Sequence, residues 1–323
     1  MVRYCVKRIL LMIPVLLCVG IIVFSLLHFC PGDPAKSILG AGATEEEIEA
    51  KREYLGLNDP FLTQLGRFVY NTYIKLDLGT SYIYGVPVVT ELKNRLPYTF
   101  VLAVTGLLTT LLVGIPLGIN AAVHQGKWQD SLSMVVALIG VSMPGFWVGL
   151  LLVILFAVRL GWLPPQGVGG IQYYILPCLA NSLGTIAGMA RQTRSAMLEV
   201  IRSDYITTAK SKGISMRKVI YGHALPNALI PVITLSGTHL AAAMGGSVVI
   251  ENVFSIPGVG SYMLTAVNQR DYPVVCGCVL LLSLIFTGMM LITDIVYGFV
   301  DPRIKAQYEA KSGKSQKKVR RTA

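Results

Sequence analysis

The chain has 323 residues, of which 53% are hydrophobic and only 14% are charged. Soluble domains carry about 25% charged residues, so this composition excludes an ordinary water-soluble protein and predicts an integral membrane protein. The formal net charge of +11 is accounted for if basic residues face anionic lipid at the inner surface of a membrane, and it does not require nucleic acid as a partner.

Six apolar segments are long enough to cross a bilayer, which takes about 20 residues. They cover residues 9–29, 98–123, 131–158, 172–190, 226–249 and 274–300. The fourth is the weakest because Pro177, Asn181, Gly184 and Gly188 interrupt it, a pattern typical of a helix packed through small residues inside a bundle. We therefore predict an all-α polytopic membrane protein with six transmembrane helices.

The segments between these helices define the organisation of the chain. Residues 1–8 form a short basic N-terminus, and the apolar run 9–29 is longer than the 7–15 residues of a signal-peptide core, so we interpret it as a retained helix. Residues 30–97 are predicted to be an external loop. Residues 98–300 form the core with a polar loop at 191–225, and residues 301–323 form a basic tail that is predicted to be disordered.

The positions of Lys and Arg predict the orientation of the chain. Of 28 such residues, 19 lie in the four segments 1–8, 124–130, 191–225 and 301–323. Cytoplasmic segments of membrane proteins are enriched in Lys and Arg. Both termini and the 191–225 loop are therefore predicted to be cytoplasmic.

A polar segment, residues 204–226, lies between two apolar spans. Ser203 is a suitable N-cap for a short helix that Gly213 ends, and Ser215 can begin a second one. Isolated helices shorter than about 12–15 residues are marginal in water, so we expect another structure to hold this segment. The sequence indicates a docking element.

The same segment resembles the coupling loop of importer-type ABC transporter permeases, whose pattern is Glu-Ala-Ala, three residues, Gly, nine residues and Ile-x-Leu-Pro. Ala209, Gly213, Leu225 and Pro226 match this pattern, whereas Thr207, Thr208 and His223 depart from it. The chain is closer to the variant Tyr-x-x-x-Ala-x-x-Lys-Gly of the peptide and nickel branch, which here is Tyr205, Ala209, Lys212 and Gly213.

Motifs elsewhere in the chain are similar to the same branch. They are Pro31–Pro34, Leu55–Pro60, Ser142–Trp147, Gly161–Pro164, Glu251–Phe254, Pro257–Gly260, Arg270–Pro273 and Asp301–Arg303. The resemblance implies a type I ABC importer permease bundle in the cell (inner) membrane. It also implies a sister permease that completes a heterodimer, two cytoplasmic ATPase subunits that use ATP and Mg, and an external solute-binding protein. Dipeptides or oligopeptides, including glutathione-like ones, are the expected cargo, and nickel or a metal chelate is the alternative.

The resemblance also implies which residues dock the ATPase. They are Asp204, Tyr205, Ala209, Lys212 and Gly213. Ala209 and Gly213 are expected to be small because a groove of the partner passes close by. Five basic residues are expected to meet acidic partner surface or lipid phosphate: Arg191, Arg194, Arg202, Lys210 and Lys212.

The chain has no sequence signature of an enzyme. A phosphate-binding loop needs Gly-x-x-x-x-Gly-Lys-Ser/Thr, and the near-match at Gly313–Ser315 has Tyr308 in place of the first Gly. Neither His-Glu-x-x-His nor Gly-x-Ser-x-Gly occurs. ATP hydrolysis is therefore expected in separate subunits, and no cofactor is predicted for this chain.

His239, in the fifth span, is a candidate substrate-binding residue, although a hydrogen bond to a neighbouring helix would also explain it. The six cysteines are scattered, and only Cys276 and Cys278 are closely spaced. Because a free Cys packs as a small hydrophobe, we interpret them as buried apolar residues. The sequence thus predicts no metal site.

Asp294 is the only acidic residue inside a predicted span. A proton-driven secondary carrier would use such a carboxylate as a relay, and this is the main rival function; a non-transport scaffold is a third. The position of Asp294 near the inner interface favours an ion pair or a helix end as its partner. The inverted repeats of many secondary carriers are not apparent.

Overall fold

The computed structural model describes residues 2–40 and 42–300. Its α-helices are α1 (Val2–Phe29), α2 (Pro34–Leu39), α3 (Glu45–Leu55), α4 (Phe61–Val69), α5 (Val88–Val123), α6 (Trp128–Ser142), α7 (Gly145–Leu152), α8 (Gln172–Ile201), α9 (Asp204–Ser211), α10 (Met216–Lys218), α11 (Leu225–Gly246), α12 (Val248–Val253), α13 (Val259–Gln269) and α14 (Tyr272–Val300). Three π-helical segments are η1 (Tyr70–Ile74), η2 (Val153–Arg159) and η3 (Val219–Ala224). The one β-type pairing among the described residues is an isolated bridge between Thr80 and Pro87, which confirms the all-α prediction. The predicted tail, 301–323, lies outside the described residues.

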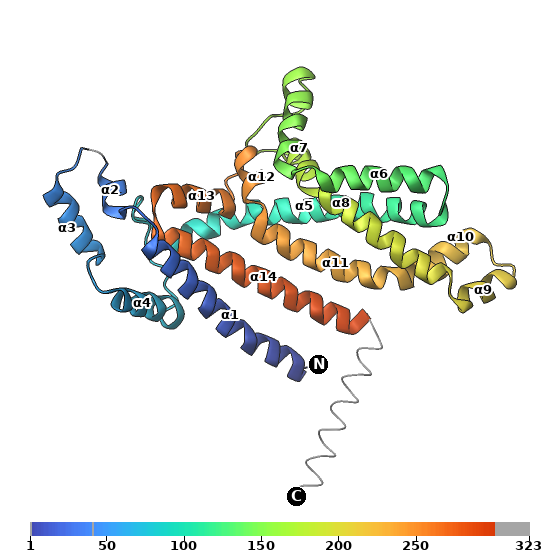
Figure 1. The fold of residues 1–323 in the computed structure, drawn as a ribbon, viewed down its shortest axis with the longest axis horizontal. Helices are drawn as coiled ribbons and strands as arrows, with labels where there is room; N and C mark the ends of the chain where they lie inside the picture. Colours follow the sequence, from blue (N-terminus) through green and yellow to red (C-terminus); the bar gives the residue numbers. More distant parts are fainter. Residues whose placement is uncertain (1, 41, 301–323) are drawn as a thin grey trace, which may run out of the picture.

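The long helices pack side by side in a bundle (Figure 1). Helix α8 packs against α5, α6, α7 and α11, while α14 packs against α11, α13 and α1. Small residues allow α5 and α8 to approach closely. A Cβ atom at Gly114 would lie 2.9 Å from Met189 Cβ, and one at Gly118 would lie 2.5 Å from the Ala190 carbonyl oxygen.

Fewer helices than predicted are both long and apolar enough to cross a membrane. Within the described part of the chain, four meet this description: Arg8–Phe29, Val88–Val123, Met216–Gly245 and Tyr272–Val296. A fifth is possible if the bent pair α6 and α7–η2 forms one span. Helix α8, which contains the predicted span 172–190, has 30 residues but is not among the four. Its buried face packs within the bundle, so it needs less apolar surface than a helix surrounded by lipid.

The predicted third span, 131–158, is not one straight helix. Helix α6 ends at Ser142, α7 begins at Gly145, and the two halves are bent by 99°. Pro144 causes the break because the residue before a proline, here Met143, is driven out of the helical region; Met143 has φ −93° and ψ 128°.

The predicted external loop, residues 30–97, contains α2, α3, α4, η1 and the first turns of α5. Helix α3 has a complete capping box, in which the backbone N–H of Glu47 donates to Thr44 Oγ1 and the N–H of Thr44 donates to Glu47 Oε2. The Thr44 N–H and the Thr44 hydroxyl both donate to Glu47 Oε2, and these two bonds lower the pKa of Glu47. Gly56 ends the helix in the left-handed conformation, with φ 67°, as glycine commonly does. Helix α5 starts ten residues before the predicted position 98, and Pro97 lies inside it.

Candidate functional site

The predicted docking segment forms a corner at one end of the bundle, between α8 and α11 (Figure 1). Ser203 is the N-cap residue of α9, and Gly213 follows its end in the left-handed conformation with φ 73°. Ser215 precedes α10, which continues through η3 into α11. These helix boundaries agree with the sequence prediction, although the Ser203 hydroxyl donates to Val200 O instead of accepting from α9.

Helix α9 is held by its own chain. Ile206 is fully buried and Ala209 is 8% exposed. Both belong to a core cluster whose other buried members are Ile119, Ala122, Ala196, Met197, Val219, Ile220, Ala224 and Ala228. Because these residues come from α5, α8, η3 and α11, packing within the chain holds α9 in place.

Four of the five predicted docking residues lie on the outside of this corner. Asp204, Tyr205, Lys212 and Gly213 are exposed. A Cβ atom at Gly213 would meet no heavy atom within 4 Å. Ala209 faces inward, so packing within the chain explains its small size. The outer face is therefore polar and open, and its role in docking stays a prediction.

The five basic residues near this corner differ in their surroundings. Arg194 makes a bidentate ion pair with Asp130 of α6, with Nε to Oδ1 at 2.6 Å and Nη2 to Oδ2 at 2.7 Å. Arg194 therefore joins α6 to α8. Its charge is paired within the chain, which corrects the expectation that it meets acidic partner surface or lipid phosphate. Arg191, Arg202, Lys210 and Lys212 are exposed, and Arg202 also contacts the side chain of Gln125.

His239 lines a cavity with both polar and apolar walls. The cavity has a volume of about 190 Å³ and is bounded by Gly106, Leu107, Thr110, Asn181, Thr185, His239, Ala242 and Ala243. Thr110 and Thr185 share a hydrogen bond of 2.7 Å across it. The Nε2 atom of His239 is buried without a hydrogen-bond partner among the described residues. The expected bond to a neighbouring helix is thus not made at this atom.

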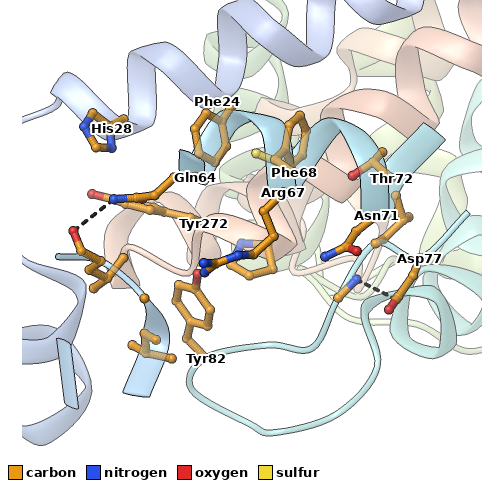
Figure 2. A pocket seen from close by; sticks show the side chains of 17 residues that line it. Phe24, His28, Gln64, Arg67, Phe68, Asn71, Thr72, Asp77, Tyr82 and Tyr272 are labelled. Carbon is orange, nitrogen blue, oxygen red and sulfur yellow. Dashed lines mark hydrogen bonds between the residues drawn. The ribbon is translucent and has the colours of Figure 1, made fainter. Parts of the chain in front are cut away.

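A second pocket lies beside the C-terminal part of α1, where α4, η1 and α14 meet (Figure 2). Its volume is about 170 Å³. The labelled walls are the aromatic side chains of Phe24, Phe68, Tyr82 and Tyr272 together with polar groups from Gln64, Arg67, Asn71 and Asp77. Burial raises the pKa of Tyr82 to about 12. The sequence analysis did not identify this pocket because its walls are far apart in the sequence.

Glu251 is a buried carboxylate that sequence reasoning treated only as part of a motif. Its side chain is fully buried. Oε1 accepts hydrogen bonds from Thr99 at 2.8 Å and Ser247 at 3.1 Å, and Oε2 accepts one from the Ser261 backbone N–H at 2.9 Å. The carboxylate thus holds the first turn of α13 against α5 and α12. Its signal in the sequence is an acidic residue shortly before the Gly-Val-Gly turn.

The surroundings of Asp294 and of the cysteines indicate structural roles. Asp294 pairs with Arg8 of α1 at 2.9 Å, which confirms the expected ion pair. Cys178, Cys276 and Cys278 are buried, as predicted, whereas Cys18 and Cys30 are exposed. The side chain of the sixth, Cys5, lies outside the described part of the structure. The described residues contain no group of three His, Cys, Asp or Glu side chains that could hold a metal ion.

Comparisons with known proteins identify the family to which this helical bundle belongs. Residues 114–306 match the family of binding-protein-dependent transport system inner membrane components, and residues 1–103 match the N-terminal family of the same membrane components. The chain belongs to this family. A "Glutathione transport system permease protein" of Escherichia coli K12 is 40% identical over 305 residues, covering 94% of this chain and 99% of that protein.

Two further comparisons extend this result. A putative peptide transport system permease protein of Brucella abortus 2308 is 43% identical over 307 residues, covering 93% of this chain and 98% of that protein. A chain of the inward-facing MetNI methionine ABC transporter superposes with a TM-score of 0.54 at 16% identity, covering 66% of this chain and 97% of that chain. The second match supports the fold alone.

Proposed function

We propose that this chain forms half of the translocation pathway of an ATP-driven importer of dipeptides or oligopeptides, including glutathione-like ones. The observation that carries the proposal is the 40–43% identity, over almost the whole chain, to permeases named for glutathione and peptide transport. A sister permease would complete the pathway. An external solute-binding protein would deliver the cargo, and two cytoplasmic ATPase subunits would supply ATP hydrolysis.

The corner between α8 and α11 is suited to pass a movement from an ATPase to the bundle. Ile206 and Ala209 of α9 pack in one cluster with residues of α5, α8 and α11. A force on the outer face of α9 therefore reaches three long helices at once. In the proposed orientation, with both termini cytoplasmic, this corner lies on the cytoplasmic side, where ATP is available.

Uptake by the reconstituted complex tests the cargo. We expect ATP-dependent uptake of a labelled dipeptide or of labelled glutathione. Unlabelled peptide should reduce this uptake by competition, and a nickel chelate should not. His239→Gln keeps a hydrogen-bonding group in the cavity, and a hydrogen bond inside a membrane is worth about 0.6 kcal/mol, so uptake should stay within roughly threefold of wild type. A different result would replace the peptide proposal with the metal one. In that case the complex takes up a nickel chelate but no peptide, and the His239→Gln variant loses this uptake although the permease is present at its normal abundance.

A further inference from the structure

Helix α4 packs on the C-terminal half of α1 and does not project away from it. The rings of Phe61 and Phe68 lie 6.3 Å and 4.9 Å from that of Phe24, and the Phe61 ring lies 5.0 Å from His28; Figure 2 shows Phe68 beside Phe24. Residues 8–29 of α1 form a 22-residue apolar span. These contacts therefore place α4 beside the last turns of a transmembrane helix.

The segment η1 reaches further along the same helix. The Tyr73 hydroxyl donates a hydrogen bond of 2.7 Å to the carbonyl oxygen of Leu16. Leu16 precedes Phe29 by 13 residues, about 20 Å at roughly 1.5 Å per residue. Gly20 makes the approach possible, because a Cβ atom there would collide with the Tyr73 hydroxyl. Part of the predicted external loop thus lies at the depth of the middle of α1.

The two sides of this segment differ in polarity. The side chains of Gln64, Arg67, Asn71 and Asp77 line the pocket beside it, and of these Arg67 and Asp77 are also exposed. The apolar side chains of Leu62, Ile74 and Leu76 are 76%, 69% and 79% exposed. Leu76 also has φ 55°, a backbone conformation that is uncommon outside glycine. A strained backbone therefore holds a large apolar side chain outward.

We propose that Phe61–Leu76 is inserted in the outer leaflet of the bilayer and that Leu62, Ile74 and Leu76 contact lipid acyl chains. Lipid fits better than a protein partner because Ile22 and Leu26 of α1, at the same depth, are also exposed, by 56% and 67%. Helical hydrogen bonds satisfy the backbone of α4 and η1, as hydrocarbon requires, and the ammonium group of Lys75 lies over the ring of Tyr70, 5.3 Å from its centre. Only the choice of leaflet rests on the proposed orientation.

Depth-dependent fluorescence quenching tests the insertion. Single cysteines replace Leu62, Ile74 or Leu76 in a full-length chain whose native cysteines are changed to Ser or Ala, and each carries an environment-sensitive fluorophore. Tyr54→Cys is the matched control, because Tyr54 is 81% exposed and lies on α3, for which the described residues show no ring stacking with α1. In phosphatidylethanolamine and phosphatidylglycerol vesicles, we expect nitroxide-labelled acyl chains to quench the three test positions at least about threefold more than position 54, and aqueous iodide to show the reverse order.

Two outcomes would overturn the proposal. Equal iodide quenching at positions 74 and 54 would mean that the segment is in water. Protection from both quenchers would mean that protein, not lipid, covers it. All three test side chains are exposed, so their replacement removes little packing, and a folding failure at one leaves the other two informative. Quenching by lipid does not depend on which way the chain crosses the membrane, so failure of the proposed orientation is measured separately.

Discussion

Glu251 shows how one buried carboxylate can fix several elements. Its replacement by Ala would leave the Thr99 hydroxyl and the Ser261 N–H without their acceptor and would open a cavity. An unpaired buried group costs about 1–3 kcal/mol, so we expect Glu251→Ala to lower the free energy of unfolding by about 3 kcal/mol. A reduced apparent melting temperature in detergent would show it.

Glu251→Gln is the matched control. The Gln side chain can accept from Ser261 N–H and donate to the hydroxyls of Thr99 and Ser247, so a loss of about 1 kcal/mol is expected. If both variants melt at the wild-type temperature, the carboxylate does not hold the start of α13.

Gly213 and Ala209 should respond to substitution in different ways. Gly213 is open to solvent, so Gly213→Arg should leave the permease abundant but weaken ATPase co-purification and uptake. Gly213→Asn is the control, because asparagine tolerates the left-handed conformation.

Ala209→Glu places a charge in the core of the corner, which costs about 3–5 kcal/mol, and should reduce the abundance of the permease itself. In contrast, normal ATPase co-purification and normal uptake with Gly213→Arg would argue against docking at the outer face of the corner.

At the scale of elements, the Asp130–Arg194 pair joins α6 to α8. The side chains are 8% and 25% exposed. Removal of either partner leaves the other charge poorly solvated, so Asp130→Ala and Arg194→Ala should each cost about 1–3 kcal/mol. The double variant should cost less than the sum of the two. Thermal unfolding of the four proteins measures this coupling, and strict additivity would mean that the pair contributes nothing beyond its separate side chains.

The elements that sequence predicts well are those with local signals. Ser203, Gly213 and Ser215 mark the ends of α9 and the start of α10 because capping and left-handed turns depend on neighbouring residues. The inward position of Ala209 depends on α5 and α8, and the contact of Tyr73 with Leu16 spans 57 residues. No local pattern encodes such contacts. The bend at Pro144 did have a local signal, the proline itself. Because apolar residues continue on both sides of it, residues 131–158 were predicted as one span.

At the scale of the whole molecule, the positions of α3 and α9 predict opposite sides of the membrane. In chains with the exposed native cysteines replaced, Glu46→Cys should react with an impermeant maleimide added to intact cells or spheroplasts. Ser211→Cys should react only after the membrane is opened, because the Lys and Arg distribution places it inside. Labelling of position 211 from outside would reverse the proposed topology.

The prefolded corner around α9 also affects the thermodynamics of assembly. A segment that folds only on binding loses backbone entropy in that step, which weakens the complex. Here Ile206 and Ala209 are already packed, so a partner orders little more than surface side chains such as Tyr205 and Lys212, at about 0.5–1.5 kcal/mol each. If an ATPase subunit binds at this face, as we propose, it would meet a surface that is already packed, and its occupancy would follow the concentration and affinity of the partner without a folding step.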